Sequence, residues 1–383
     1  MENTTYNMVI KGGTLVDPAQ GAQGAQARRD VAFAGGLVAA SDEDIPASQA
    51  ARAVDASGHL VVPGMIDLHV HVFEGISWLG IAPDPTCLAR GVTTVVDAGS
   101  AGADTFPGFR KYVIEVSATR IYAHLNISSQ GMLSPDIGEL DELKWASIPR
   151  ALEVIEAHRD RILGVKVRLT RDSIVGENAG LQPLYRAREA ADAAGLPVMV
   201  HPQNAWCSSL DEVLAVMKER DILTHSFHGM SHGILDEEGR IRRSVRRARA
   251  RGVLFDVGHG AGSFSWRVCE AALAQDFPPD TISSDLHVRN VDGPVYDLAT
   301  TVSKFLYLGF SLEDALAKVT AIPAQVIGMG ERLGTLAVGA RGDAVVLELK
   351  EGSFALQDCH QDVRTAGQLL VPRVVIKDGR VYE

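Results

Sequence analysis

The middle of the chain alternates short apolar runs with stretches of helical periodicity, and this pattern constrains the fold more than any other feature. Runs of strand length occur at residues 65–69, 93–97, 121–125, 164–169, 197–201, 222–225, 253–257 and 281–285. Helical patterns follow at residues 148–157, 183–194, 210–220, 265–275, 296–308 and 312–319. Apolar strands separated by helices are typical of a parallel sheet wrapped by helices. Eight such units predict a (β/α)₈ TIM barrel, whose active site lies at the C-terminal ends of the strands.

Both ends of the chain differ from this middle. Residues 6–60 and 334–382 contain short β-rich runs broken by glycine turns, and residues 371–382 are typical of a hairpin around Asp378-Gly379. Neither end has enough strands to stand alone. We therefore expect both ends to pair in one small β-sandwich, formed by residues 1–62 and 334–383, with the barrel at residues 63–333 between them.

Composition excludes several classes of function. The 383 residues carry a net charge of -11, which argues against nucleic acid as a partner. The arginine-rich stretch 240–251 has apolar residues at helical spacing, so we interpret it as a solvated helix. No signal peptide is visible, no apolar run is long enough to cross a bilayer, and the four cysteines form no Cys-x-x-Cys pair. We expect a cytoplasmic protein that acts on a small molecule, away from membranes.

A His-x-His motif ends the first strand of the predicted barrel. Alternate side chains of a strand point the same way, so His69 and His71 face one side together. Two imidazoles on a rigid strand end form half of a site for a divalent metal such as Zn²⁺. Taken alone, the motif is also consistent with chance.

Further metal-ligating residue types stand at the ends of other predicted strands. These are Lys166, His201, His225 and Asp285. A lysine inside an apolar strand is costly unless it is modified or paired. Carboxylation by CO₂ would convert Lys166 into an anionic bidentate ligand. Together these residues suit a pair of divalent ions, and their joint occurrence at separate strand ends makes chance a poor explanation.

The motifs around these residues resemble those of the amidohydrolase superfamily, in its binuclear branch. They include Pro-Gly-Met-Ile-Asp-Leu-His-Val-His at 63–71, Gly-Val-Lys-Val-Arg at 164–168, Val-His-Pro at 200–202, Leu-Thr-His-Ser-Phe-His-Gly at 223–229, Asp-Val-Gly-His-Gly at 256–260 and Ser-Asp-Leu-His at 284–287. The resemblance covers essentially the whole chain. It is strongest to the dihydroorotase-like amidohydrolases that are often labelled deacetylases.

The resemblance implies a role for each ligand. The more buried metal ion would take His69, His71 and Asp285, the second ion would take His201 and His225, and carboxylated Lys166 would bridge both, together with a hydroxide. Asp285 would accept the proton of the hydroxide and pass it to the leaving group. The ions would be Zn²⁺ or Mn²⁺, because these ligand types constrain the metal weakly. The resemblance also implies a homo-oligomer.

The expected reaction is hydrolysis of an amide or ester of a small acylated acid, either an N-acyl amino acid or an O-acyl 2-hydroxy acid. The alternatives are a dihydroorotase-like cyclic-amide hydrolase, an isoaspartyl-type dipeptidase, a lyase or isomerase on the same barrel, and a non-catalytic scaffold. Dihydroorotases carry an arginine two positions after the second histidine of His-x-His, where this chain has Phe73. Mononuclear deaminases use a glutamate near the strand-five histidine, and His201-Pro202-Gln203-Asn204 lacks it.

Three residues are candidates for binding the substrate. Arg168 lies two residues after Lys166, so it faces the mouth and suits a substrate carboxylate, or else pairs with a local acid. His259 follows the seventh strand and either lines the pocket or stabilises its loop. His287 lies two residues after Asp285, where it would hold that carboxylate or touch the substrate.

Overall fold

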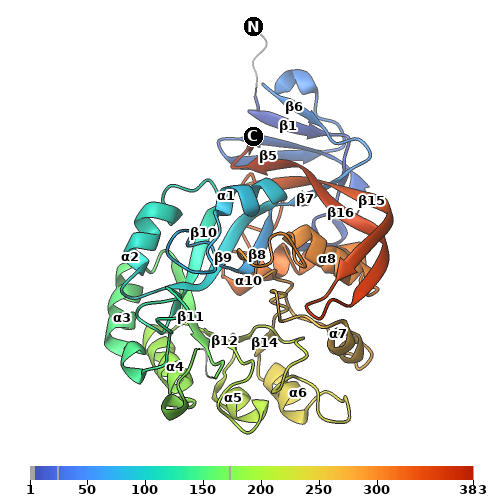
Figure 1. The fold of residues 1–383 in the computed structure, drawn as a ribbon. Coiled ribbons are helices and arrows are strands. Elements are labelled where there is room, and N and C mark those ends of the chain that lie inside the picture. The colour runs from blue at the N-terminus through green and yellow to red at the C-terminus, as the bar shows by residue number, and fades with distance from the viewer. Residues whose placement is uncertain (1–4, 24–25, 172–173, 383) are drawn as a thin grey trace.

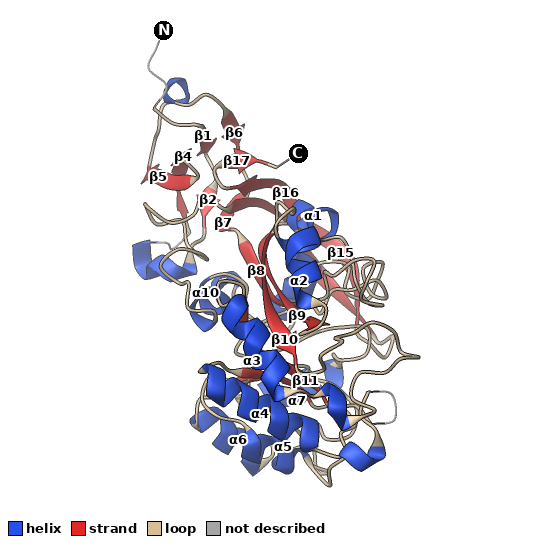
Figure 2. Cartoon of the chain, turned by 90° about the vertical axis from the view of Figure 1, so that its left-hand side faces the viewer, coloured by secondary structure: helices blue, strands red, loops and turns tan. Residues whose placement is uncertain are grey.

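Strands from both chain ends gather at one end of the molecule, above a barrel that contains the middle of the chain (Figure 1). The computed structural model describes residues 5–23, 26–171 and 174–382. Helices cover the outside of the barrel strands, as the turned view also shows (Figure 2). This arrangement confirms the predicted TIM barrel with a small sandwich at the chain ends.

The barrel sheet has seven named strands, all parallel, in the order β14-β13-β12-β11-β10-β9-β8. They are β8 (Met65–Val70), β9 (Val92–Gly102), β10 (Arg120–Asn126), β11 (Ile162–Arg168), β12 (Val198–His201), β13 (Ile222–Leu223) and β14 (Leu254–Phe255). Nearly every side chain in these strands is buried, as expected for a parallel sheet covered by helices.

The eighth predicted strand, residues 281–285, closes the barrel without forming a regular strand. Isolated parallel bridges join Thr281 to Asp256 and Leu286 to Val70. Side chains replace part of the backbone ladder, because the Asp67 carboxylate accepts hydrogen bonds from the backbone and hydroxyl of Ser284. The segment is therefore positioned by buried polar contacts, which the apolar pattern of the sequence does not reveal.

Ten α-helices lie in the described ranges. They are α1 (Pro83–Thr86), α2 (Phe106–Phe109), α3 (Ile148–Ala157), α4 (Gln182–Ala194), α5 (Leu210–Val216), α6 (Arg243–Ala250), α7 (Trp266–Leu273), α8 (Leu298–Tyr307), α9 (Leu312–Ala317) and α10 (Ala321–Val326). α4 is followed by Gly195, whose φ of 69° suits glycine. α6 buries Val245 and Ala248 beneath its arginines, which confirms the interpretation of the arginine-rich stretch. Within the described ranges, no helix is long and apolar enough to cross a membrane.

Two sheets form the sandwich. The strands of one, in spatial order, are β5 (Leu37–Asp42), β4 (Asp30–Ala34), β1 (Met8–Lys11) and β6 (Ala53–Asp55). Those of the other are β17 (Arg380–Val381), β16 (Val363–Lys377), β15 (Ala344–Gln357), β7 (Leu60–Pro63), β2 (Thr14–Leu15) and β3 (Ala27–Arg28). The antiparallel pairing of β15 with β7 joins the two chain ends in one sheet.

The hairpin of β15 and β16 continues beyond the sandwich along the barrel (Figure 1). Leu370 N donates to Ser303 Oγ of α8 at 2.9 Å, and Trp266 N donates to Asp358 Oδ2 near the hairpin tip at 3.0 Å. One apolar core includes residues of both the hairpin and the barrel, such as Leu356 and Val302. The predicted boundaries at 62/63 and 333/334 stay predictions.

Candidate metal centre and substrate pocket

Four imidazoles and one carboxylate meet at the C-terminal mouth of the barrel. His69 and His71 come from β8, His201 ends β12, His225 follows β13, and Asp285 lies in the closing segment. The ring centroids of His69 and His225 lie 4.8 Å apart, and those of His201 and His225 lie 4.4 Å apart. Ligand atoms of His69, His225 and Asp285 all lie within 4.8 Å of one another. Residues separated by more than half of the sequence thus form one cluster.

Lys166 on β11 points into the same cluster. Its Nζ lies 3.4 Å from His69 Nε2 and 3.5 Å from Met199 Sδ, and its side chain is fully buried. Burial lowers the pKa of Lys166 to about 7, against the opposing charge of Asp285. The amine therefore lies beside the imidazole cluster, and its carboxylation stays a prediction.

Hydrogen bonds at the outer nitrogens orient three of the imidazoles. His225 Nδ1 donates to Gly258 O at 2.6 Å. His69 Nδ1 contacts Thr224 Oγ1 at 2.8 Å, and that hydroxyl donates to Asp256 Oδ2 at 2.8 Å, so the histidine is the donor. His71 Nδ1 contacts Ser100 Oγ at 2.9 Å. Such outer contacts fix the tautomer, and they leave the Nε2 lone pairs of these rings facing the cluster.

His201 bonds through its other ring nitrogen. Its Nε2 contacts Thr170 Oγ1 at 3.1 Å. Each of the four imidazoles is therefore held by a hydrogen bond at one of its ring nitrogens.

The inward-facing atoms suit a bound cation. Asp285 Oδ1 is buried and has no hydrogen-bond partner among the described residues, yet it lies 3.3 Å from His69 Nε2 and 3.2 Å from His71 Nε2. Burial lowers the pKa of His71 to about 3 and shifts the pKa of His69 in the same direction, so both rings are neutral at pH 7. A carboxylate oxygen facing neutral imidazole nitrogens is unfavourable unless a positive charge lies between them. Imidazole and carboxylate are ligands that Zn²⁺ and Mn²⁺ accept, so the donor set fits a divalent metal.

Unusual backbone conformations support the same cluster. His225 and Asp285 have φ values of 57° and 49°, which non-glycine residues seldom adopt. Gly260 packs so closely against Asp285 Oδ2 that a Cβ atom there would clash. Backbone strain at two proposed ligands is typical of a functional site.

A pocket of about 200 Å³ opens above the cluster. Outside the cluster, its lining includes Trp78, Leu79, Gln203, Met230, Ser263 and Arg289. Two of the three predicted substrate-binding residues, Arg168 and His287, also line it.

Arg168 lines the pocket, and its guanidinium is paired with the buried carboxylate of Glu139. Of the two roles considered for it, the structure shows the pairing with a local acid, and a contact with a substrate carboxylate stays a prediction. Glu139 in turn accepts a hydrogen bond from Asn126 Nδ2 at 3.3 Å. The charge of Arg168 is therefore balanced within the wall of the pocket.

His287 lies close to Asp285, with 4.0 Å between His287 Nε2 and Asp285 Oδ2. His287 Nδ1 accepts a hydrogen bond from Arg289 N at 3.1 Å, so a neutral ring carries its proton on Nε2. That N–H belongs to the ring nitrogen that lies near Asp285 Oδ2.

His259 lies behind the pocket and is not among its lining residues. It is fully buried, its ring stacks on Phe264, and its Nδ1 donates to Gly260 O at 2.9 Å. Lys304 of α8 donates to His259 Nε2 at 2.6 Å. These contacts stabilise the loop that contains Gly258 and Gly260, and a direct contact of His259 with substrate stays a prediction.

Residues 60–382 match the model of the amidohydrolase family. The chain belongs to the amidohydrolase family. Proteins of this family generally use a binuclear metal centre, and the cluster of His69, His225 and Asp285 lies where such a centre is expected.

Among curated relatives, this amidohydrolase is similar to proteins named deacetylase. One from Agrobacterium fabrum is 36% identical over 366 residues, covering 95% of this chain and 89% of the relative. One from Enterococcus faecalis is 32% identical and covers 99% of each chain.

Two solved structures are similar over almost the whole amidohydrolase chain. One titled as an adenine deaminase has a TM-score of 0.90 and 32% identity, covering 99% of this chain and 100% of that one. One titled as a dihydroorotase has a TM-score of 0.88 and 34% identity, covering 98% and 97%. The fold is therefore shared by proteins whose titles state different reactions.

Sequence reasoning missed the residues that orient the ligands and shape the pocket. Thr224 stands beside His225 in the Leu-Thr-His-Ser motif, so its adjacency to a ligand was the available signal. Trp78 and Arg289 lie in loops that no periodic pattern singles out.

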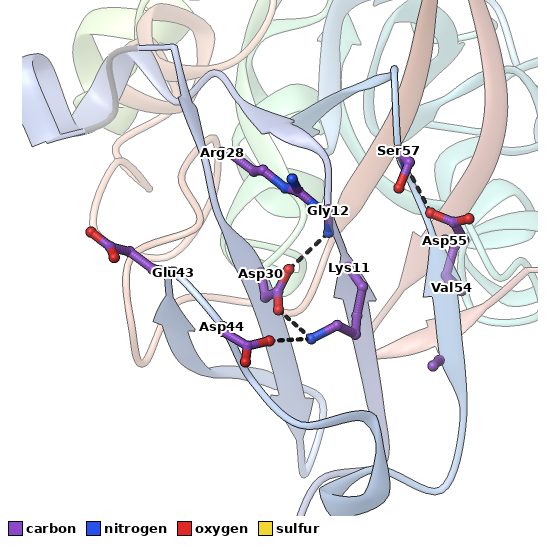
Figure 3. A pocket seen from close by; sticks show the side chains of 10 residues that line it. Lys11, Gly12, Arg28, Asp30, Glu43, Asp44, Val54, Asp55 and Ser57 are labelled. Carbon is purple, nitrogen blue, oxygen red and sulfur yellow. Dashed lines mark hydrogen bonds and ion pairs between the residues drawn. The ribbon is translucent and has the colours of Figure 1, made fainter.

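A larger hollow of about 760 Å³ lies on the terminal sandwich (Figure 3). Lys11 points into it, and its Nζ donates to Asp30 Oδ2 at 2.6 Å, to Asp44 Oδ1 at 2.8 Å and to Ile45 O at 2.6 Å. Asp30 also accepts hydrogen bonds from Gly12 N and Ile45 N. The charges at the centre of this hollow are already paired with one another.

Proposed function

We propose that this amidohydrolase hydrolyses the amide or ester bond that joins an acyl group to a small acid. The substrate would be an N-acyl amino acid or an O-acyl 2-hydroxy acid. The observation that carries the proposal is a buried oxygen of Asp285, which has no hydrogen-bond partner among the described residues and lies among neutral imidazole nitrogens that line a small pocket. The deacetylase names of relatives from three bacterial species support release of an acyl group.

The cluster would hold two divalent ions, Zn²⁺ or Mn²⁺. Bound there, the ions supply the Lewis acidity that activates water and polarises a carbonyl group. Carboxylation would remove the cost of the buried Lys166 amine and add an anionic ligand. We assign His69, His71 and Asp285 to one ion, His201 and His225 to the other, and carboxylated Lys166 to both.

Asp285 would move the proton during the reaction. Its Oδ2 lies on the His287 side of the carboxylate, beside Gly260. The carboxylate would accept a proton from the attacking water and donate it to the departing nitrogen or oxygen, which yields a carboxylic acid and a free amino or hydroxy acid. The Nε2–H of His287 and the guanidinium of Arg168 would orient the polar groups of the substrate.

A substrate screen on metal-loaded protein tests the proposal. The protein is prepared with Zn²⁺ or Mn²⁺ and bicarbonate, and then mixed with N-acyl and O-acyl acids of both hands, cyclic amides, isoaspartyl dipeptides and adenine. We expect release of the acyl group from acyclic acyl acids, with solvent oxygen in one product. Hydrolysis of cyclic amides or isoaspartyl dipeptides alone, or turnover without solvent oxygen, would contradict the proposal.

Metal and mass analyses test the centre separately from the substrate. We expect about two divalent ions per chain and, in gentle mass spectrometry with bicarbonate, the added mass of one CO₂ that disappears in Lys166→Met. A chain with much less than one ion and no hydrolysis in any condition would be a scaffold and not an enzyme.

A further inference from the structure

Two loops at the pocket mouth meet in a stacked pair formed by Arg289 and Trp78. The Arg289 guanidinium lies 4.6 Å from the centre of the Trp78 ring. The same loops are joined by a backbone hydrogen bond from Val288 N to Leu79 O at 3.1 Å. Because Trp78 and Arg289 both line the pocket, the stack forms part of the wall that a substrate meets.

A compact turn fixes Arg289 relative to Asp285. The buried Asn290 side chain donates to Asp285 O at 2.7 Å and accepts from His287 N at 2.9 Å. Arg289 N then donates to His287 Nδ1 at 3.1 Å. The cation is thus held by the same turn that positions the proposed proton carrier.

The two arginines of the pocket differ in charge balance. Arg168 is paired with the buried Glu139, so the pair presents donors without net charge. Arg289 has an exposed side chain, and within the described part of the chain no carboxylate pairs with it. Stacking on an indole orients a guanidinium without neutralising it. Arg289 is therefore an uncompensated positive charge aimed at the pocket.

We propose that Arg289, held on Trp78, binds the carboxylate of the substrate and selects acids over neutral acyl compounds. This inference rests on the proposed function, since it names the group that recognises the acid. A guanidinium with free donors binds a carboxylate through two parallel hydrogen bonds, which gives both charge and direction. Arg168 with Glu139 contributes direction but cannot add net attraction for an anion.

The test compares Arg289→Gln with the wild type on matched substrates. The probes are N-acetyl amino acids, O-acetyl 2-hydroxy acids and their primary carboxamides, which keep the scissile bond and lose the charge. We expect Arg289→Gln to lower kcat/KM for the acid about 10- to 100-fold, mainly through KM, because a hydrogen bond to a charged group is lost. The carboxamide should change less than about threefold, since it never used the charge.

Matched variants separate the effect of losing the Arg289 charge from a general effect of substitution on folding. Arg150→Gln makes the same charge change on α3, at an arginine that pairs with Asp104 and Glu153 and does not line the pocket, so it should keep the wild-type preference. Arg289→Lys should recover part of the preference, and Trp78→Leu should raise KM for the acid less than Arg289→Gln does. Metal content and thermal unfolding should match the wild type in each variant.

The possible failures are distinguishable. If the wild type hydrolyses no acylated acid, the proposed function fails. If the wild type prefers the acid and Arg289→Gln keeps that preference, the inference about Arg289 is overturned while the proposed function stands. If only Arg168→Gln loses the preference for the acid, Arg168 binds the substrate carboxylate, and the inference about Arg289 is likewise overturned.

Discussion

The two hollows of this protein differ in whether their polar groups have hydrogen-bond partners, and this difference matters more than their sizes. The larger one, about 760 Å³ on the terminal sandwich, contains a lysine whose donors are taken up by Asp30, Asp44 and Ile45 (Figure 3). The smaller one, about 200 Å³ at the barrel mouth, has a buried oxygen of Asp285 without a partner in the described part of the chain. Folding favours paired polar groups, so a buried carboxylate oxygen left open among imidazole nitrogens fits a place where a cation binds.

This difference in hydrogen bonding predicts what substitutions in each hollow do. Polar groups that pair with one another stabilise the fold, so their removal should lower stability and leave catalytic activity unchanged. Substitution of polar groups that need a metal or a substrate should lower activity more than stability. Four variants or conditions test this contrast.

The largest effect should come from Asp285→Asn. The amide keeps the shape but is a poor base and a poor metal ligand, so we expect kcat/KM to fall about a thousandfold. Steady-state kinetics at equal metal loading measures this. A variant that keeps a tenth of the wild-type rate would remove Asp285 from proton transfer.

Thr224→Val should have a smaller effect on the same site. The change removes the hydroxyl that accepts from His69 Nδ1 and donates to Asp256, with little change in volume. Loss of such an outer contact lowers metal affinity about 10- to 100-fold. Titration with a competing chelator measures the affinity. Thr320→Val is the matched control, because Thr320 is equally buried and donates to Leu316 O in a helix away from the pocket.

Asp30→Ala tests the opposite region. It leaves Lys11, Gly12 N and Ile45 N without their shared acceptor, so we expect the free energy of unfolding to fall by about 1–3 kcal/mol. Urea unfolding measures the loss, while kcat/KM should stay at the wild-type value. A large fall in kcat/KM with unchanged stability would show that the sandwich hollow takes part in function.

The smallest effect should be a dependence of stability on acid pH. Burial by itself raises the pKa of Asp30, but hydrogen bonds from Ile45 N, Lys11 and Gly12 N outweigh it and lower the pKa below its ordinary value. A lowered pKa in the folded state adds stability above the unfolded pKa, and this stability is lost as pH falls through the folded value. Below about pH 4, unfolding curves of the wild type and Asp30→Ala should therefore converge. If the difference in stability between the wild type and Asp30→Ala stayed constant throughout that pH range, the lowered pKa of Asp30 would be contradicted.

The sequence predicted the barrel strands that form a regular ladder, and the side chains it proposed as ligands at the strand ends lie together in the structure. His69 and His71 were predictable because a strand repeats every two residues, so local spacing already places both rings on one side. The closing segment was predicted as a strand, but its contacts run through Ser284 and Asp67, which no apolar pattern encodes. α5 ends at Val216, before the predicted end at 220, and Arg220 adopts a φ of 69° there.

By itself, the sequence determined the fold class, the order of the proposed ligands along the chain and the chemical nature of their donor atoms, because periodicity and residue type are local properties. Tertiary structure alone decided which ring nitrogen of each imidazole is held by a hydrogen bond, that Glu139 balances Arg168, and that Arg289 rests on Trp78. These contacts join segments far apart in the chain. Their geometry depends on how loops close over the barrel, and on which polar groups find partners once water is excluded.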